Sequence, residues 1–241
     1  MAGWVAEIPR AIARHKPDPL SSVVLTIPVF VAYHLGVLMV KVRSGVDWVS
    51  GLAFELLDHS VPAYVGATLA AALLLMLAVW IQRRRGRVKP TALLPIVAES
   101  CVWAVAMLIS IGWATHAVVA AAGAPAFAHA LGPFDKLILS AGAGFHEEAV
   151  FRVGMLSGGA LALQRWAGFG RSGALLVMLP ASSAAFAIVH HLGPYAESVS
   201  LVALMFRALA GMFLAGVYLV RGFAVAVYTH AIYDALVFFV P

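Results

Sequence analysis

The chain alternates long apolar runs with short polar segments over its 241 residues. A transmembrane helix needs about 20 consecutive, mostly apolar residues, because it must cross a hydrocarbon layer of about 30 Å. About seven runs reach this length, at residues 21–41, 60–82, 92–121, 135–163, 172–192, 200–220 and 222–240. The pattern predicts an all-α fold, a polytopic transmembrane helix bundle.

Two further segments are expected at the membrane surface. Residues 45–58 are too short and too acidic to span a bilayer. Residues 1–20 place three cations beside apolar residues at roughly helical spacing, which predicts an interfacial N-terminal helix rather than a cleaved signal peptide. No repeat or low-complexity linker divides the chain, so residues 1–241 are expected to form a single membrane domain.

Composition supports the membrane class. Hydrophobic residues make up 63% of the chain and charged residues 11%, whereas soluble domains carry about 45–50% and about 25%. The net charge of +5 does not indicate nucleic acid, because the basic block at 83–89 directly follows an apolar run, as in a cytoplasmic loop. Cys101 is the only cysteine, which excludes an internal disulfide and a thiolate metal site.

The basic residues also predict an orientation. With a cytoplasmic N-terminus and seven spans, one side receives Arg10, Arg14, Lys16, the 83–89 block, Arg165, Arg171 and Arg221. The opposite loops at 123–134 and 193–199 carry almost no charge. Only Lys41 and Arg43 do not fit this orientation. The C-terminus is therefore expected outside. The Ala-rich composition fits a bacterium, so we expect an integral protein of the bacterial inner membrane.

Ionisable residues within the apolar runs are the most informative ones, because each charge at bilayer depth costs about 2.5–3.5 kcal/mol on insertion scales. Glu99 is expected to snorkel or cap its helix, and Arg207 to anchor near the outer interface. Isolated histidines are expected to form hydrogen bonds between helices; they are His34, His116 and His191. The candidate site residues are Glu147, Glu148, Arg152, His190, His230 and Asp234.

These residues form pairs at helical spacing on three separate runs. Glu148 and Arg152 stand four residues apart and are expected to form an ion pair. Glu147 points about 100° away from Glu148 on an α-helix and has no local cation, which suits a general base. His230 and Asp234 share a face, so Asp234 is expected to orient His230 or to add a hydrogen bond of its own. In the orientation predicted from the basic loops, the ionisable side chains of all three runs lie between the midplane and the outer third of the membrane.

The pattern Glu147-Glu148-x-x-x-Arg152, Phe186-x-x-x-His190 and His230-x-x-x-Asp234 resembles the CPBP family of CAAX prenyl proteases and bacteriocin-processing intramembrane proteases, over residues 135–240. The resemblance implies that Glu147 activates water with the help of His190. It also implies that His230 and Asp234 polarise the scissile carbonyl, and that Glu148 and Arg152 hold the first motif. The last motif of the family often ends in Asn, so Asp234 is a variation.

The resemblance leaves the cofactor open. Family members are often labelled metalloproteases, and Glu147, His190 and His230 would then be the zinc ligands. Position 150 is Val, so there is no HExxH motif, and we expect no cofactor, with zinc as the alternative. An outward site would suit a protein or peptide substrate with a C-terminal or signal-like membrane segment, as in myxosortase-like sorting enzymes.

Three alternatives stay open at this point. A transporter or proton relay would also bury Glu, His and Asp at mid-depth, although two related halves are not visible in the sequence. A scaffold or immunity protein of the same family would share the motifs without the activity. A cysteine-based sorting transpeptidase would depend on Cys101. Hydrolysis and transfer to an amine also remain undecided by the sequence.

Overall fold

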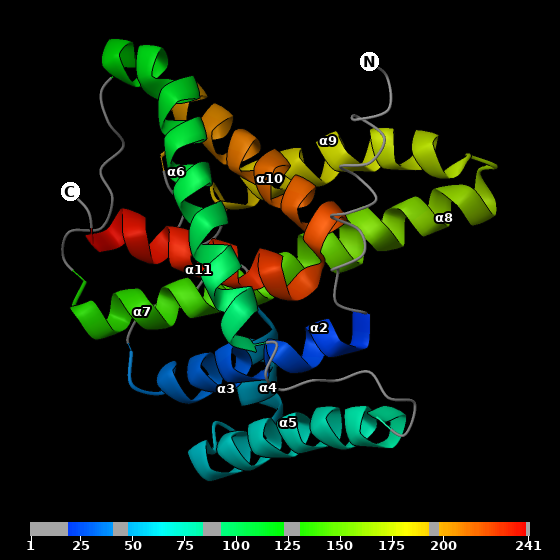
Figure 1. Cartoon of the computed structure of the whole chain (residues 1–241). Helices are drawn as coiled ribbons and strands as arrows, with labels where there is room; N and C mark the ends of the chain where they lie inside the picture. The colour runs from blue at the N-terminus through cyan, green and yellow to red at the C-terminus, as the bar shows by residue number, and fades with distance from the viewer. Residues whose placement is uncertain (1–18, 41–47, 84–92, 123–130, 193–197, 240–241) are drawn as a thin grey trace.

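The fold is built entirely of helices among the residues that the structure describes (Figure 1). The computed structural model describes residues 19–40, 48–83, 93–122, 131–192 and 198–239. Its elements are α2 (Pro19–Leu25), α3 (Ile27–Gly36), α4 (Trp48–Leu56), α5 (Val61–Arg83), α6 (Leu93–Ala122), α7 (Pro133–Gly142), η2 (Ala143–Gly158), α8 (Gly159–Trp166), α9 (Arg171–Val189), α10 (Leu201–Arg221) and α11 (Phe223–Phe239). The predicted all-α class is confirmed.

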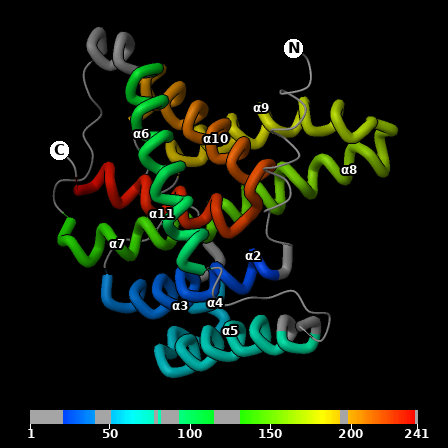
Figure 2. The backbone as a smooth tube through the Cα atoms, viewed as in Figure 1, coloured from blue at the N-terminus to red at the C-terminus, as the bar shows by residue number. Residues whose placement is uncertain are grey.

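The first apolar run is broken into two helices, which corrects the prediction of one continuous helix over 21–41. The break lies at Thr26, whose buried hydroxyl donates to the Val23 carbonyl at 2.7 Å. Pro28 follows at the start of α3, where its missing N–H costs nothing. α5 packs on α2, α3 and the short α4 at one edge of the bundle (Figure 2).

The fourth run is one helical segment made of α7, η2 and α8. α7 starts at Pro133, and the Asp135 carboxylate accepts the Gly132 N–H at 3.2 Å. The middle portion, η2, is a π-helix of 16 residues, a rare form that occurs mostly at functional sites. It contains Glu147, Glu148 and Arg152, so the α-helical angles expected from the sequence do not apply there.

α10 and α11 are separated by a single residue, Gly222. Its φ of 92° and ψ of −178° lie in a region that is essentially restricted to glycine. The backbone can therefore turn sharply after Arg221, and α11 starts at Phe223. This turn brings α11 back against η2 and α6, which it contacts along much of its length.

η2 packs mainly against two helices from later in the chain. α9 and α11 contact it closely, and α10 packs on α9 and α11 (Figure 1). The main core cluster joins α6, η2, α9, α10 and α11 through Met107, Phe151, Phe186, Leu214 and Tyr233, among other residues. Gly144 permits the approach of α11, because a Cβ there would meet the Val227 carbonyl oxygen at 2.7 Å and the Ala231 nitrogen at 2.9 Å.

The helices suit a bilayer. Three of them are long and apolar enough to span it by themselves, Leu93–Ala114, Arg171–Val189 and Leu201–Arg221, and shorter apolar helices accompany them. The chain is thus a helical membrane protein, while the number of seven spans stays a prediction. The predicted interfacial helix over 1–20 lies outside the described residues, apart from the first two residues of α2. The basic block at 84–89 lies outside them as well.

Candidate active site

The three motifs come together inside the bundle. η2 contributes Glu147, Glu148 and Arg152, α9 ends next to His190, and α11 contributes His230 and Asp234. Glu147, Glu148, Arg152 and His230 are buried, and His190 and Asp234 are partly exposed. Every residue proposed for the site from the sequence is therefore part of one cluster.

Glu148 links two helices at the closed side of this cluster. Its Oε2 lies 3.2 Å from Arg152 Nε, as the four-residue spacing predicts, and neither side chain is exposed. Its Oε1 lies 2.9 Å from His230 Nδ1 on α11. A carboxylate can only accept, so Nδ1 carries a proton and donates it to Glu148. This hydrogen bond fixes the ring so that Nε2 is the atom that faces the rest of the site.

Glu147 lies between two imidazoles. Its Oε2 is 3.6 Å from His190 Nε2 and 3.8 Å from His230 Nε2. Both distances exceed a direct hydrogen bond. One buried carboxylate that faces two imidazoles from two other helices is an arrangement suited to proton transfer.

Phe186 has more contacts than the sequence indicated. Its backbone carbonyl accepts the Nδ1–H of His190 at 2.7 Å, which leaves Nε2 of His190 directed at Glu147. Its ring centroid lies 4.9 Å from the guanidinium of Arg152, a favourable cation–π geometry for a desolvated cation. The same ring lies 5.8 Å from His230. Phe186 thus positions one histidine and packs on two other site residues.

The site has an open side and a closed side. The side chains of His190 and Asp234 are 15% and 17% exposed, whereas those of Glu148 and Arg152 are fully covered. Asp234 Oδ2 lies 3.6 Å from His230 Nε2, too far for a direct hydrogen bond. The orienting partner of His230 is therefore Glu148, and Asp234 instead lies beside Nε2 at the opening. A substrate would enter past His190 and Asp234.

The sequence assigned Arg207 on α10 to an interfacial anchor, and the structure adds that its charge reaches the site. It is half-buried, and its charge acts on Glu147, His190 and Tyr233. The signal was present in the sequence, since a cation within an apolar run usually faces the bundle interior. Its helix has no motif, so only packing could reveal its neighbours.

Other polar residues of the membrane runs lie away from this cluster. Both Nε and Nη2 of Arg221 donate to the carboxylate of Glu99, the latter at 2.8 Å, and Trp103 donates to it at 3.0 Å. His34 Nδ1 contacts the Tyr64 hydroxyl at 2.7 Å, as expected of a histidine that joins helices. His191 acts electrostatically on its neighbour His190, and the side chain of His116 lies outside the described residues. Cys101 is exposed on α6.

Comparison with known proteins identifies this arrangement. Residues 130–236 match the family described as type II CAAX prenyl endopeptidase Rce1-like. This match supports the resemblance of residues 130–236 to the CPBP family. No curated protein and no solved structure matches it significantly.

The CPBP match covers all three motifs and therefore α7, η2, α8, α9, α10 and most of α11. It indicates a CAAX protease-type enzyme of the membrane. The match supports the predicted family, while the myxosortase-like subtype stays a prediction. It also favours an endopeptidase over a transporter or proton relay.

The cofactor stays a prediction, and Glu147, His190 and His230 are the residues that would hold zinc. Among the described residues, no three His, Cys, Asp or Glu side chains are gathered as a set of metal ligands. Glu147 Oε2 lies 3.6 Å from His190 Nε2 and 3.8 Å from His230 Nε2, and donor atoms that share one zinc at about 2.0–2.2 Å lie at similar separations. The reaction proposed below uses side chains and water.

Proposed function

We propose that this protein is an intramembrane endopeptidase in which Glu147 and His190 activate water, and His230 with Asp234 polarises the scissile carbonyl. The observation that carries the proposal is the position of the Glu147 carboxylate, which faces Nε2 of both histidines from a buried helix. Glu148 and Arg152 act as positioning residues behind them.

The first step is addition of water. A water molecule between Glu147 Oε2 and His190 Nε2 donates one proton to each acceptor, because the Nδ1–H of His190 is already given to the Phe186 carbonyl. Glu147 takes up one of these protons as the oxygen of water forms a bond to the carbonyl carbon. General-base assistance of this kind contributes about 10²–10⁴-fold to a rate.

The second step is collapse of the tetrahedral intermediate. In its doubly protonated form, His230 donates Nδ1–H to Glu148 and Nε2–H to the developing oxyanion. The proton held by Glu147 passes to the leaving nitrogen, the C–N bond breaks, and the products are a carboxylic acid and an amine. The buried setting strengthens these charge interactions, because little water competes with them.

The substrate we propose is a membrane-embedded or membrane-proximal peptide bond in a C-terminal or signal-like segment. This proposal is supported by the partial exposure of His190 and Asp234 at the open side of the site. The loop charges predict that this open side faces outward. A cytoplasmic N-terminus follows from the same loop charges. A bacterial inner-membrane location rests on the Ala-rich composition, and a role in protein sorting rests on the outward site.

The test compares membranes that contain the wild type, Glu147→Ala or His190→Ala, and follows C-terminal processing of membrane and surface proteins by mass spectrometry. The proposal expects both variants to abolish the same processing events at normal protein levels. Cys101→Ala is the matched control, because Cys101 is exposed on α6 and is expected to be dispensable. Unchanged processing in the Glu147 variant would contradict the proposal, and loss in the Cys101 variant would favour a thiol mechanism.

A further inference from the structure

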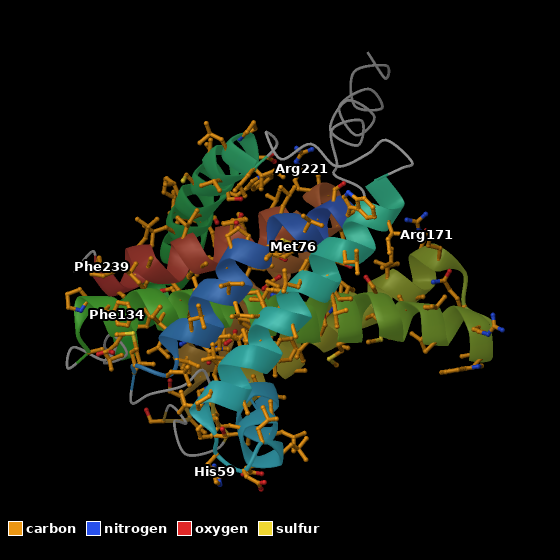
Figure 3. The ribbon with its side chains drawn as sticks, turned by 90° about the horizontal axis from the view of Figure 1, so that it is seen from below. His59, Met76, Phe134, Arg171, Arg221 and Phe239 are labelled. Atoms are coloured by element: carbon orange, nitrogen blue, oxygen red, sulfur yellow. The ribbon has the colours of Figure 1, made fainter. Side chains whose placement is uncertain are left out.

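A second cleft lies away from the active site, at the end of the bundle where α10 meets α11. It has a volume of about 360 Å³ and is bordered by α2, η2, α8, α9 and the start of α11. Arg171 and Arg221 lie towards this end, opposite Phe134 and Phe239 (Figure 3). The loop charges predict that this end is cytoplasmic.

The cleft is amphipathic. Its polar residues are Arg171, Ser22, Ser157, Gln164 and Tyr218, and no Asp or Glu lines it. The rest of the lining is apolar apart from Gly222, and includes Val23, Val153, Leu175 and Phe223. A ligand that fits has an anionic polar part and an apolar part.

Two of the polar groups lack a protein partner. Ser22 is 1% exposed, yet its hydroxyl forms no hydrogen bond. Leaving such a buried group unsatisfied costs about 1–3 kcal/mol, so a ligand that accepts its proton recovers that cost. Arg171 at the start of α9 forms no ion pair with any carboxylate in the described part of the chain. Arg221, in contrast, is neutralised by Glu99.

We propose that this cleft binds an anionic phospholipid. The phosphodiester accepts from the guanidinium of Arg171 and from the Ser22 hydroxyl, and the acyl chains follow the apolar wall formed by Val153, Leu175 and Phe223. Phosphate oxygens suit a forked guanidinium donor, and basic pockets between membrane helices bind such headgroups. The lipid would contact α2, α8 and the start of α11 together.

The experiment uses the delipidated full-length protein and native mass spectrometry with phosphatidylglycerol or phosphatidylcholine of the same acyl chains. We expect Arg171→Gln to weaken phosphatidylglycerol binding at least about fivefold, which corresponds to about 1 kcal/mol, and to leave phosphatidylcholine binding unchanged. Arg165→Gln is the matched control, since it removes the same charge from the neighbouring end of α8 without lining the cleft. Equal losses in both variants would overturn the proposal.

A second variant tests the cleft itself. Leu175→Trp fills the space without a change of charge and is expected to reduce the binding of phosphatidylglycerol, with a thermal unfolding curve like that of the wild type. Retained binding in this variant would contradict a site in the cleft. Competition by millimolar inorganic phosphate that displaces the lipid completely would mean a simple anion site, and would also overturn the lipid assignment. Neither result depends on peptidase activity.

Discussion

Glu148 on η2 accepts the Nδ1–H of His230 on α11 at 2.9 Å, while its other carboxylate oxygen lies 3.2 Å from Arg152 Nε. One fully buried side chain therefore fixes a histidine of another helix and is held in turn by a cation of its own helix. The first and last motifs are joined by this contact, and the Nε2 atom of His230 is directed towards Glu147 and Asp234 as a consequence.

Replacing Glu148 by Gln should lower both activity and stability. The amide keeps the shape but leaves Arg152 as an uncompensated buried cation and weakens the orientation of His230, and such orienting partners are worth about 10–100-fold in activity. The measurement is peptidase rate together with thermal unfolding.

Glu99→Gln is the control variant. It breaks the ion pair with Arg221 outside the site, and should lower stability with a nearly unchanged rate. Equal rate losses in both variants would contradict the positioning role.

Asp234 lies beside Nε2 of His230 at the opening, so its chemistry can be probed directly. Asp234 can donate a hydrogen bond to the oxyanion only as a protonated carboxyl, and an amide can replace that donor. Asp234→Asn should therefore retain activity within about tenfold, whereas one such donor is worth about 10²–10³-fold. Asp234→Ala should lose about 10²-fold for the same reason. Steady-state rates on one substrate distinguish the two. Comparable rates for Asn and Ala would show that this position contributes no hydrogen bond.

Gly144 allows η2 and α11 to approach closely. In Gly144→Ala the new methyl group would meet backbone atoms of Val227 and Ala231, which cannot move as a flexible side chain could. We expect a loss of about 1–3 kcal/mol of stability and a lower rate, since Glu147 and His230 lie on these two helices. Gly112→Ala is the control, because a Cβ there meets nothing within 4 Å. Equal unfolding temperatures would contradict the close approach.

Metal removal tests the choice between a water-activating carboxylate and a zinc site. We expect the rate of the purified enzyme to be unchanged after treatment with a strong chelator, and unchanged again on addition of zinc. A loss of activity that zinc restores would instead assign Glu147, His190 and His230 as ligands.

The sequence predicted the membrane class and the site residues because charges at bilayer depth are costly and therefore few. Glu148 and Arg152 could be paired from their spacing, since both lie on one helical segment. The partner of His230 could not be predicted this way, because contacts between helices depend on their crossing and rotation. The π-helical form of η2 was not visible in the α-helical spacing, and the break at Thr26 lies inside a run that is mostly apolar, so hydropathy did not reveal it. The sequence did not assign Arg207 to the site, because α10 carries no local motif around it.

The central claim is that Glu147 activates the water that cleaves the peptide bond. Its most direct test is cleavage of a substrate by reconstituted wild type and Glu147→Gln in heavy-oxygen water, with mass spectrometry of the new C-terminus. The account predicts that the wild-type product carries heavy oxygen in its new carboxylate, and that Glu147→Gln forms this product at least about 10²-fold more slowly. A product joined to an amine, or an unchanged rate in Glu147→Gln, would contradict it.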